Sequence, residues 1–194
     1  MEDFNFNNLQ SMMNEFSGRV ADTALALKNI YKRRVKWKCV EFIIDEIPEP
    51  SHRPRISHGY RFYVPGAAKH QAYFDKFVRP KLNGLFISTP CKVFMDVYCP
   101  TPKSFTKTQK ILAEMKILRP WGNVGDVDNF FKAYTDCLMP NEKRGHIGIL
   151  EDDCLIIHNE TNKFYSATPR IEIRIEYMVN IPKEMLSILR LNKQ

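Results

Sequence analysis

The sequence has no paired-cysteine motif and no long hydrophobic run. Its five cysteines are odd in number, widely spaced and never arranged as CxxC, so the sequence indicates neither a disulfide framework nor a thiolate zinc site. No apolar run approaches the roughly 18 residues that span a membrane, and the N-terminus lacks the basic and then apolar pattern of a secretion signal. These absences predict an unsecreted protein of a reducing compartment, the cytoplasm, with no membrane partner.

Several familiar catalytic motifs are also missing. The sequence contains no GxSxG, GxGxxG or GxxxxGK[ST] segment, so the serine-hydrolase, dinucleotide and P-loop classes have no support and we expect no nucleotide cofactor. The five histidines form no HxxxH or HxH pair, so a histidine-based metal site is not indicated.

What the chain does contain is enough apolar residues for one core and an excess of positive charge. Hydrophobic residues make up 44% of its 194 residues, which is typical of a folded domain rather than a disordered segment. Lysine and arginine total 29 against 22 acidic residues, giving a formal charge of +7. A basic protein of this size suits an anionic partner such as nucleic acid.

Hydrophobic periodicity predicts a mixed α/β (α+β) domain, in which helices flank a mixed β-sheet. Helices are expected at residues 9–31, 67–82, 104–115 and 130–139, with Ser104 capping the third. Strands are expected at residues 40–47, 60–64, 92–99, 154–158 and 170–178, the last two forming a hairpin joined by a polar segment at 159–169. We divide the chain into an N-terminal helical extension with a basic end (1–38), a main domain (39–180) and a C-terminal tail or short helix (181–194).

Positive charge gathers in residues 32–38, in a loop that includes Arg53 and Arg55, and in residues 103–116. Residues 32–38 carry five cations and a tryptophan, and include Lys32, Arg33, Arg34 and Lys36. They are consistent with a phosphate-contacting patch with a stacking ring, and equally with a solvated helix end. A second group of cations, which includes Arg53 and Arg55, lies on a loop stiffened by prolines.

Acidic residues concentrate at Asp126 and Asp128, and again at Asp152 and Asp153. If residues 126–128 are extended, two carboxylates point to one side with Cα atoms about 7 Å apart, close enough to share an ion. Oxygen ligands without cysteine favour a hard divalent cation, Mg²⁺ with Mn²⁺ as a substitute. Such ions activate water and stabilise phosphodiester cleavage.

Each of these residues also has a structural interpretation. Asp128 is a suitable N-cap for the helix that follows, and Asp152 with Asp153 is typical of a turn before a strand. Lys132 and Asp136 continue the four-residue spacing from Asp128, which predicts surface ion pairs, and for Asp136 we expect only that role.

A combination of segments resembles the RusA family of Holliday-junction resolvases. Asp126-Val127-Asp128-Asn129-Phe130-Phe131-Lys132-Ala133 is similar to the family's D-x-D-N-x-x-K-A signature, and Leu150-Glu151-Asp152-Asp153 resembles its later aspartate pair. The proline and arginine loop after residue 47 and the segment from Lys163 to Glu172 resemble the family's N-terminal loop and closing strand. The likeness covers about residues 40–178. It departs from the family just before Asp126: the family often has a basic residue followed by proline there, whereas here Asn123-Val124-Gly125 intervenes after Arg119-Pro120.

The resemblance implies a RusA-like fold and a symmetric homodimer that nicks four-way DNA junctions in pairs with Mg²⁺, in recombination and repair. It implies that Asp126, Asp128 and Asp153 are metal-binding catalytic residues, that Asp152 is a further candidate ligand, and that Lys132 is the essential lysine. The expected DNA-binding residues are Arg53, Arg55, Lys132, Lys163, Lys32, Arg33, Arg34 and Lys36. The expected setting is a bacterial or phage-infected cell. The alternatives are a non-catalytic branched-DNA-binding module and a metal nuclease that prefers flaps or duplex.

Overall fold

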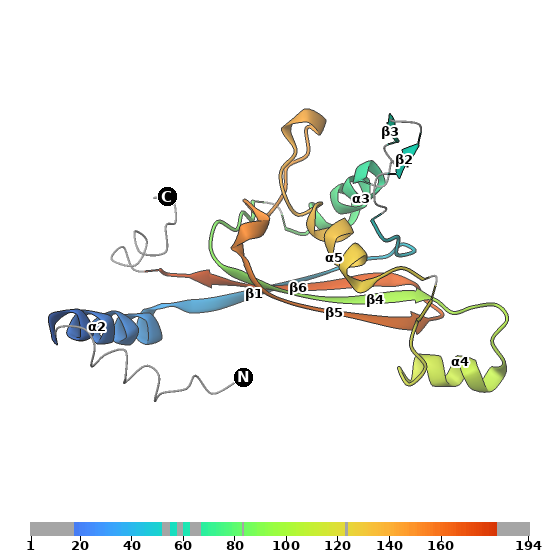
Figure 1. The fold of residues 1–194 in the computed structure, drawn as a ribbon, viewed down its shortest axis with the longest axis horizontal. Helices are drawn as coiled ribbons and strands as arrows, with labels where there is room; N and C mark the ends of the chain where they lie inside the picture. Colours follow the sequence, from blue (N-terminus) through green and yellow to red (C-terminus); the bar gives the residue numbers. More distant parts are fainter. Residues whose placement is uncertain are drawn as a thin grey trace. The chain divides into compact units, whose positions relative to one another are not determined.

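A four-stranded sheet forms the centre of the main part of the protein (Figure 1). The computed structural model describes residues 18–51, 55–57, 60–62, 67–82, 84–122 and 124–181. The strand order is β1-β6-β4-β5, with β4 parallel to β5 and antiparallel to β6, so the predicted mixed sheet is confirmed. The strands are β1 (Lys36–Ile44), β4 (Cys91–Pro100), β5 (Ile156–Ser166) and β6 (Arg170–Val179).

The last two strands differ from the prediction. β5 is eleven residues long, so the supposed polar linker at residues 159–169 is mostly strand. The predicted hairpin is wrong because β4 lies between β5 and β6, and the short connection crosses the end of β4. β5 is an edge strand with several exposed positions, and its polar sequence therefore lacks the apolar alternation by which a half-buried strand is recognised.

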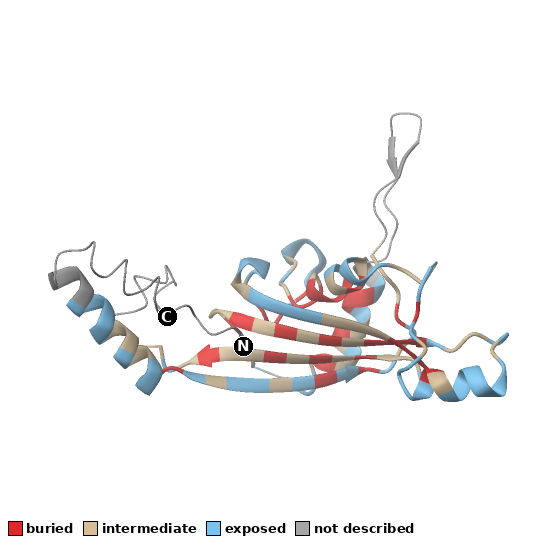
Figure 2. Ribbon diagram, turned by 60° about the horizontal axis from the view of Figure 1, so that its bottom comes forward, coloured by how far each residue is buried: buried red, intermediate tan, exposed pale blue. Residues whose placement is uncertain are grey.

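Two helical segments cover one face of the sheet. They are α3 (Ala67–Tyr73), which continues as a π-helical turn at Phe74–Val78, and α5 (Val127–Thr135). Alternation along β4 and β6 matches the prediction, since every second side chain is buried (Figure 2). The side chains that meet in this core include Phe74, Val78, Phe130, Ala133, Val93, Met95, Val97, Ile171, Ile173 and Ile175.

The helix α4 (Lys107–Glu114) begins two residues later than predicted. Thr106, not Ser104, is its N-cap: the Thr106 hydroxyl accepts from the Gln109 backbone N–H at 3.2 Å, and the Gln109 side chain accepts from the Thr106 N–H at 2.8 Å. Ser104 is excluded from the cap because the preceding turn closes at Phe105, whose N–H donates to the Pro102 carbonyl. The helix start is therefore set by a reciprocal capping box.

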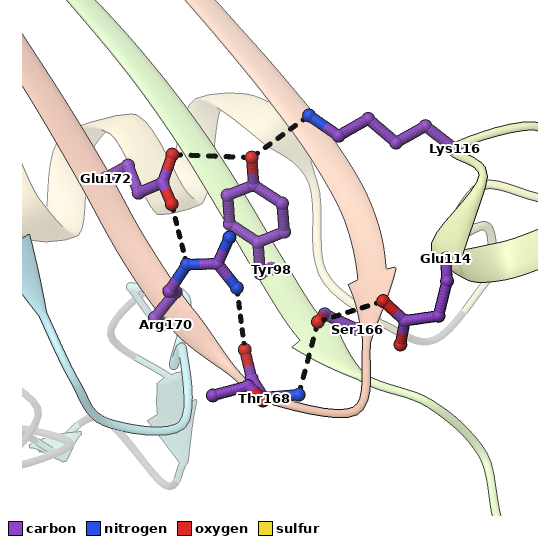
Figure 3. A network of polar contacts seen from close by, with 7 residues as sticks. All are labelled: Tyr98, Glu114, Lys116, Ser166, Thr168, Arg170 and Glu172. Carbon is purple, nitrogen blue, oxygen red and sulfur yellow. Dashed lines mark hydrogen bonds and ion pairs between the residues drawn. The ribbon is translucent and has the colours of Figure 1, made fainter.

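Polar contacts join the end of α4 to the sheet (Figure 3). The Glu114 carboxylate accepts from the Ala167 N–H at 2.5 Å and from the Ser166 hydroxyl at 3.4 Å, and the Lys116 amine donates to the Tyr98 hydroxyl at 3.1 Å. Arg170 stacks on the same tyrosine ring. The segment that leaves α4 is thus anchored where β4 and β5 end, before it continues to Asp126.

Contacts divide the chain into two compact units, Cys39–Tyr177 and a unit formed by Met1–Lys38 with Met178–Gln194. In the second unit α2 (Gly18–Arg34) replaces the predicted helix 9–31, whose first residues lie outside the described ones. Its small apolar cluster contains Leu27, Tyr31, Val35, Trp37, Met178 and Ile181. No helix among the described residues is long and apolar enough to cross a membrane.

The basic run at the end of α2 is exposed in this unit. Lys32, Arg33 and Arg34 form the last turn of the helix, where cations interact favourably with the helix dipole, and Lys36 begins β1. Trp37 is half-buried and packs in the apolar cluster, so it is occupied by packing rather than presented as a stacking ring.

Candidate active site beside α5 and β5

The helix α5 presents two carboxylates at its start. Phe130, Ala133 and Tyr134 fall on one side of the helix and are buried in the core, which leaves the opposite side to solvent. Asp126 is the N-cap residue with extended backbone (φ −81°, ψ 152°), but its side chain makes no capping hydrogen bond. Asp128 lies in the first helical turn.

Residues 126–128 are therefore not extended as a unit, and Asp128 is not the N-cap that one interpretation predicted. Both carboxylates are exposed, and among the described residues neither has a hydrogen-bond or ion-pair partner. The helix dipole stabilises negative charge at this end, which lowers the cost of placing two anions together. The arrangement leaves two neighbouring carboxylates available to a ligand.

Further along α5, one helical turn apart, lie Lys132 and Asp136. Their charged groups are 3.4 Å apart, with Lys132 largely and Asp136 partly exposed, so the predicted surface ion pair is confirmed for these two residues. Together with Asp153, Ile156 and Asn159 they line a cleft of about 290 Å³ between α5 and the start of β5. This α5–β5 cleft brings Lys132 and Asp153 together.

The paired aspartates before β5 have different surroundings. Asp152 caps the 3₁₀ turn at Asp153–Leu155: its carboxylate accepts from the Cys154 N–H at 2.8 Å, and this bond lowers the pKa of Asp152. The predicted turn role is thus confirmed for Asp152. Asp153 is exposed and lines the cleft, where its carboxylate can reach a bound group.

A proline-containing segment is fixed to the same helix. The Glu49 N–H donates to the buried Tyr134 hydroxyl at 3.1 Å, and the Ser51 N–H donates to the Asn129 carbonyl at 3.0 Å. His70 also donates from Nε2 to the Glu49 carbonyl at 3.0 Å. The chain that leads into the basic loop therefore starts from the side of α5, beside the predicted catalytic residues.

The basic loop itself contains a short hairpin. β2 (Arg55–Ser57) pairs antiparallel with β3 (Tyr60–Phe62), with Arg55 opposite Phe62. Arg55 is therefore placed on this hairpin, while Arg53 lies outside the described residues.

Polar side chains also follow the edge strand β5 on the face that α5 covers. Asn159, Thr161 and Lys163 pair with Val93, Met95 and Val97 of β4, whose side chains enter the core beneath the helices. Because directly paired residues point to the same face, these polar groups lie on the helix side of the sheet. The Lys163 amine donates to the Gly125 carbonyl at 2.5 Å, immediately before Asp126.

In the sequence, Gly125 stood out only as part of the departure from the family before Asp126, without a structural role. Its φ is +102°, and a Cβ there would meet Pro50 Cγ at 2.8 Å and Phe130 Cε2 at 3.1 Å. Glycine is needed for both the backbone conformation and the close approach of the proline-containing segment. The only available signal was its place directly before the first aspartate.

The carboxylates of Asp126 and Asp128 are chemically suited to bind a divalent cation. Among the described residues no three histidine, cysteine, aspartate or glutamate side chains are grouped as a metal site. Mg²⁺, however, commonly binds one or two protein carboxylates and takes its remaining ligands from water and substrate phosphate. Asp126 and Asp128, which are exposed and have no partner among the described residues, fit that requirement.

The chain is similar to known proteins over the residues that contain this candidate site. Residues 46–176 match the family model described as Endodeoxyribonuclease RusA, a span that contains α5, the cleft and the proline-containing segment. The chain is also similar to a Bacillus subtilis (strain 168) protein named "Uncharacterized protein YqaN", with 33% identity over 148 residues, which covers 71% of this chain and 95% of that protein.

Proposed function

Because the chain belongs to the RusA endodeoxyribonuclease family, we propose that it is a Mg²⁺-dependent endonuclease that resolves four-way DNA junctions by paired nicks. Membership of this family supports a nuclease that is related to junction resolvases. Metal identity, paired nicking and the residues responsible belong to the proposal.

The observation that carries the proposal is the set of charged groups along the exposed side of α5. Asp126 and Asp128 have no described protein partner at the helix start, and Lys132 follows Asp128 by one turn, about 6 Å along the axis. Asp153 shares the cleft with Lys132. Because the Lys132 amine pairs with Asp136, Asp128 one turn earlier keeps a carboxylate without a described ion pair.

We assign each group a role in phosphodiester cleavage. Asp126 and Asp128 would hold the ion, which when bound supplies a nucleophile at neutral pH and stabilises charge on the attacking and leaving oxygens. The Lys132 amine binds a non-bridging phosphate oxygen and orients the scissile bond. We assign Asp153, which lines the cleft with Lys132, as a further metal-binding carboxylate, and Asp152, already bonded to the Cys154 N–H, supports the turn that carries Asp153.

DNA is gripped, in this proposal, by cations outside the cleft. We assign backbone contacts to Arg53 and Arg55, which follow in the sequence after Ser51, whose N–H is bonded to the Asn129 carbonyl of α5. Lys32, Arg33, Arg34 and Lys36 supply further phosphate contacts in the other compact unit. Two copies of the site, brought by a homodimer, account for two nicks in one junction. The expected setting is the cytoplasm, where branched DNA arises.

Substitution of the aspartates tests the proposal. Asp126→Asn and Asp153→Asn should abolish nicking of a four-way junction in Mg²⁺ while junction binding is kept or improved, because removing a negative charge cannot weaken contact with phosphate. Asp45→Asn, an exposed aspartate at the end of β1, is the matched control and should cut normally. Equal nicking by the wild type and both variants would refute the assignment. Absence of divalent-dependent nicking in the wild type would favour a non-catalytic DNA-binding module.

A further inference from the structure

We propose that Lys163 is a positioning residue: its amine holds the Gly125 carbonyl and thereby fixes the backbone that presents Asp126. This inference rests on the proposed nuclease function and assigns Lys163 a role other than the DNA contact that the sequence suggested. The hydrogen bond joins residues 38 positions apart, from the edge strand β5 to the residue before α5.

The segment in front of Asp126 needs such a support. It leaves α4 and contains the largely exposed Trp121 (80% exposed) and Gly122, followed by Gly125 in a positive-φ conformation. The first backbone hydrogen bond of α5 starts at the Asp126 carbonyl, which accepts from the Phe130 N–H at 3.2 Å. The helix α5 therefore fixes the backbone of Asp126 through its carbonyl only, on the C-terminal side of the residue.

The strand β5 holds this segment through Lys163, whose amine binds the Gly125 carbonyl. The strand is itself fixed at this point, because Tyr165, two residues later, is buried in the core. The contact therefore joins a strand that packs in the core to the turn that leads to the first aspartate.

The geometry of Lys163 favours the tether over a direct DNA contact. Its side chain is half-buried on the face of β5 that lies under α5, and it runs opposite Val97 in the strand register. A charge-assisted bond of 2.5 Å to a carbonyl is short, and it stabilises one position of the peptide group between Gly125 and Asp126. Loss of the bond leaves that peptide group free to rotate and displaces the carboxylate.

A small displacement of a catalytic group has a large effect on rate. Misplacement by about 1 Å can cost about 100-fold, and loss of a residue that orients a metal ligand typically costs about 10- to 100-fold in metal affinity or activity. For Lys163→Met we therefore expect the Mg²⁺ concentration for half-maximal nicking to rise about 10-fold or more, with a lower maximal single-turnover rate. Lys163→Arg keeps a donor on a long side chain and should recover most of the activity.

Junction binding separates the tether from a DNA contact. In EDTA, the tether predicts that Lys163→Met binds the junction within about twofold of the wild type. The slope of log affinity against log salt should also stay unchanged, because no phosphate contact is lost. A DNA-contacting lysine would instead weaken binding and reduce that slope by about one unit. Lys143→Met, an exposed lysine in the 3₁₀ turn at Glu142–Arg144, is the matched control.

A third measurement does not depend on cleavage. Amide hydrogen exchange of residues 119–127 should be at least several-fold faster in Lys163→Met than in the wild type and in Lys143→Met, with the rest of the chain unchanged. If Lys163→Met does not fold, Lys163→Gln replaces it, since the shorter amide does not reach the Gly125 carbonyl.

The outcomes distinguish this inference from the proposed function. Faster exchange at residues 119–127, a raised Mg²⁺ requirement and an unchanged salt slope support the tether. Unchanged exchange, or weaker binding with a smaller salt slope and a normal Mg²⁺ requirement, overturns it. A wild-type protein that never nicks DNA overturns the proposed function, and the exchange experiment then still decides whether Lys163 holds the turn.

Discussion

Substitution of Gly125 by alanine tests the architecture that supports the first aspartate. At φ +102° a non-glycine residue loses about 1–2 kcal/mol relative to glycine. The new Cβ would also lie 2.8 Å from Pro50 Cγ and 3.1 Å from Phe130 Cε2, an overpacking that typically costs about 1–3 kcal/mol. Because Phe130 is fully buried and Pro50 belongs to a segment bonded to α5, neither neighbour can retreat freely.

The expected loss of stability is about 2–5 kcal/mol, which corresponds to a fall in Tm of about 4–20 °C for a protein of this size. Thermal unfolding followed by circular dichroism measures this shift. Nicking at a temperature where the variant is folded should fall about 10-fold or more, because any relief of the clash moves Asp126.

Gly122→Ala is the matched control for this prediction. Gly122 also has a positive φ, +73°, but a Cβ there meets nothing within 4 Å. Gly122→Ala should lose only the stability that a non-glycine residue costs at positive φ, about 1–2 kcal/mol, and it should keep its nicking activity. If the two alanine variants unfold at the same temperature and nick DNA equally well, the close packing of Gly125 against the proline-containing segment is not what positions Asp126.

Three further substitutions test other parts of the structure. Tyr134→Phe removes the acceptor of the Glu49 N–H and should lower the free energy of unfolding in urea by about 1 kcal/mol. It should also weaken binding of the junction. An unchanged affinity for the junction would show that this bond does not organise the basic loop. Thr106→Ala removes the capping box of α4 and should cost about 1 kcal/mol in urea unfolding without loss of nicking, whereas no cost would disprove the cap. Asp152→Asn should lower Tm slightly at neutral pH and not at about pH 2. Folding lowers the pKa of Asp152, so its carboxylate stabilises the fold above its unfolded pKa and loses that effect as the pH falls through its folded pKa. A Tm difference that persists in acid would contradict the bond to the Cys154 N–H.

Some strands and helices could be predicted because their apolar residues recur at the spacing of that structure, every second residue in a strand and every third or fourth in a helix. Val93, Met95 and Val97 alternate along β4, and Ile171, Ile173 and Ile175 along β6, since these strands bury one face under the helices. The helix α5 was predicted for the same reason, from apolar residues three and four apart. Its motif residues then placed the candidate site on that helix.

Other features depend on contacts that no local pattern reveals. β5 was assigned too short because an edge strand keeps polar residues in the strand, such as the exposed Asn159 and the half-buried Thr161. The bond between Lys163 and Gly125 joins distant parts of the chain, so spacing along the sequence could not indicate it. The choice of Thr106 over Ser104 as the cap was decided by a turn that ends at Phe105.

The most direct test of the central claim compares three DNA substrates with the wild-type protein. A four-way junction, a flap and a linear duplex of matched sequence are incubated in Mg²⁺ and in EDTA, and the products of each strand are resolved. We expect Mg²⁺-dependent nicks in two opposed strands of the junction, with much slower cutting of the flap and the duplex. Equal cutting of all three substrates would contradict junction selectivity, and no Mg²⁺-dependent cutting of any would contradict the nuclease itself.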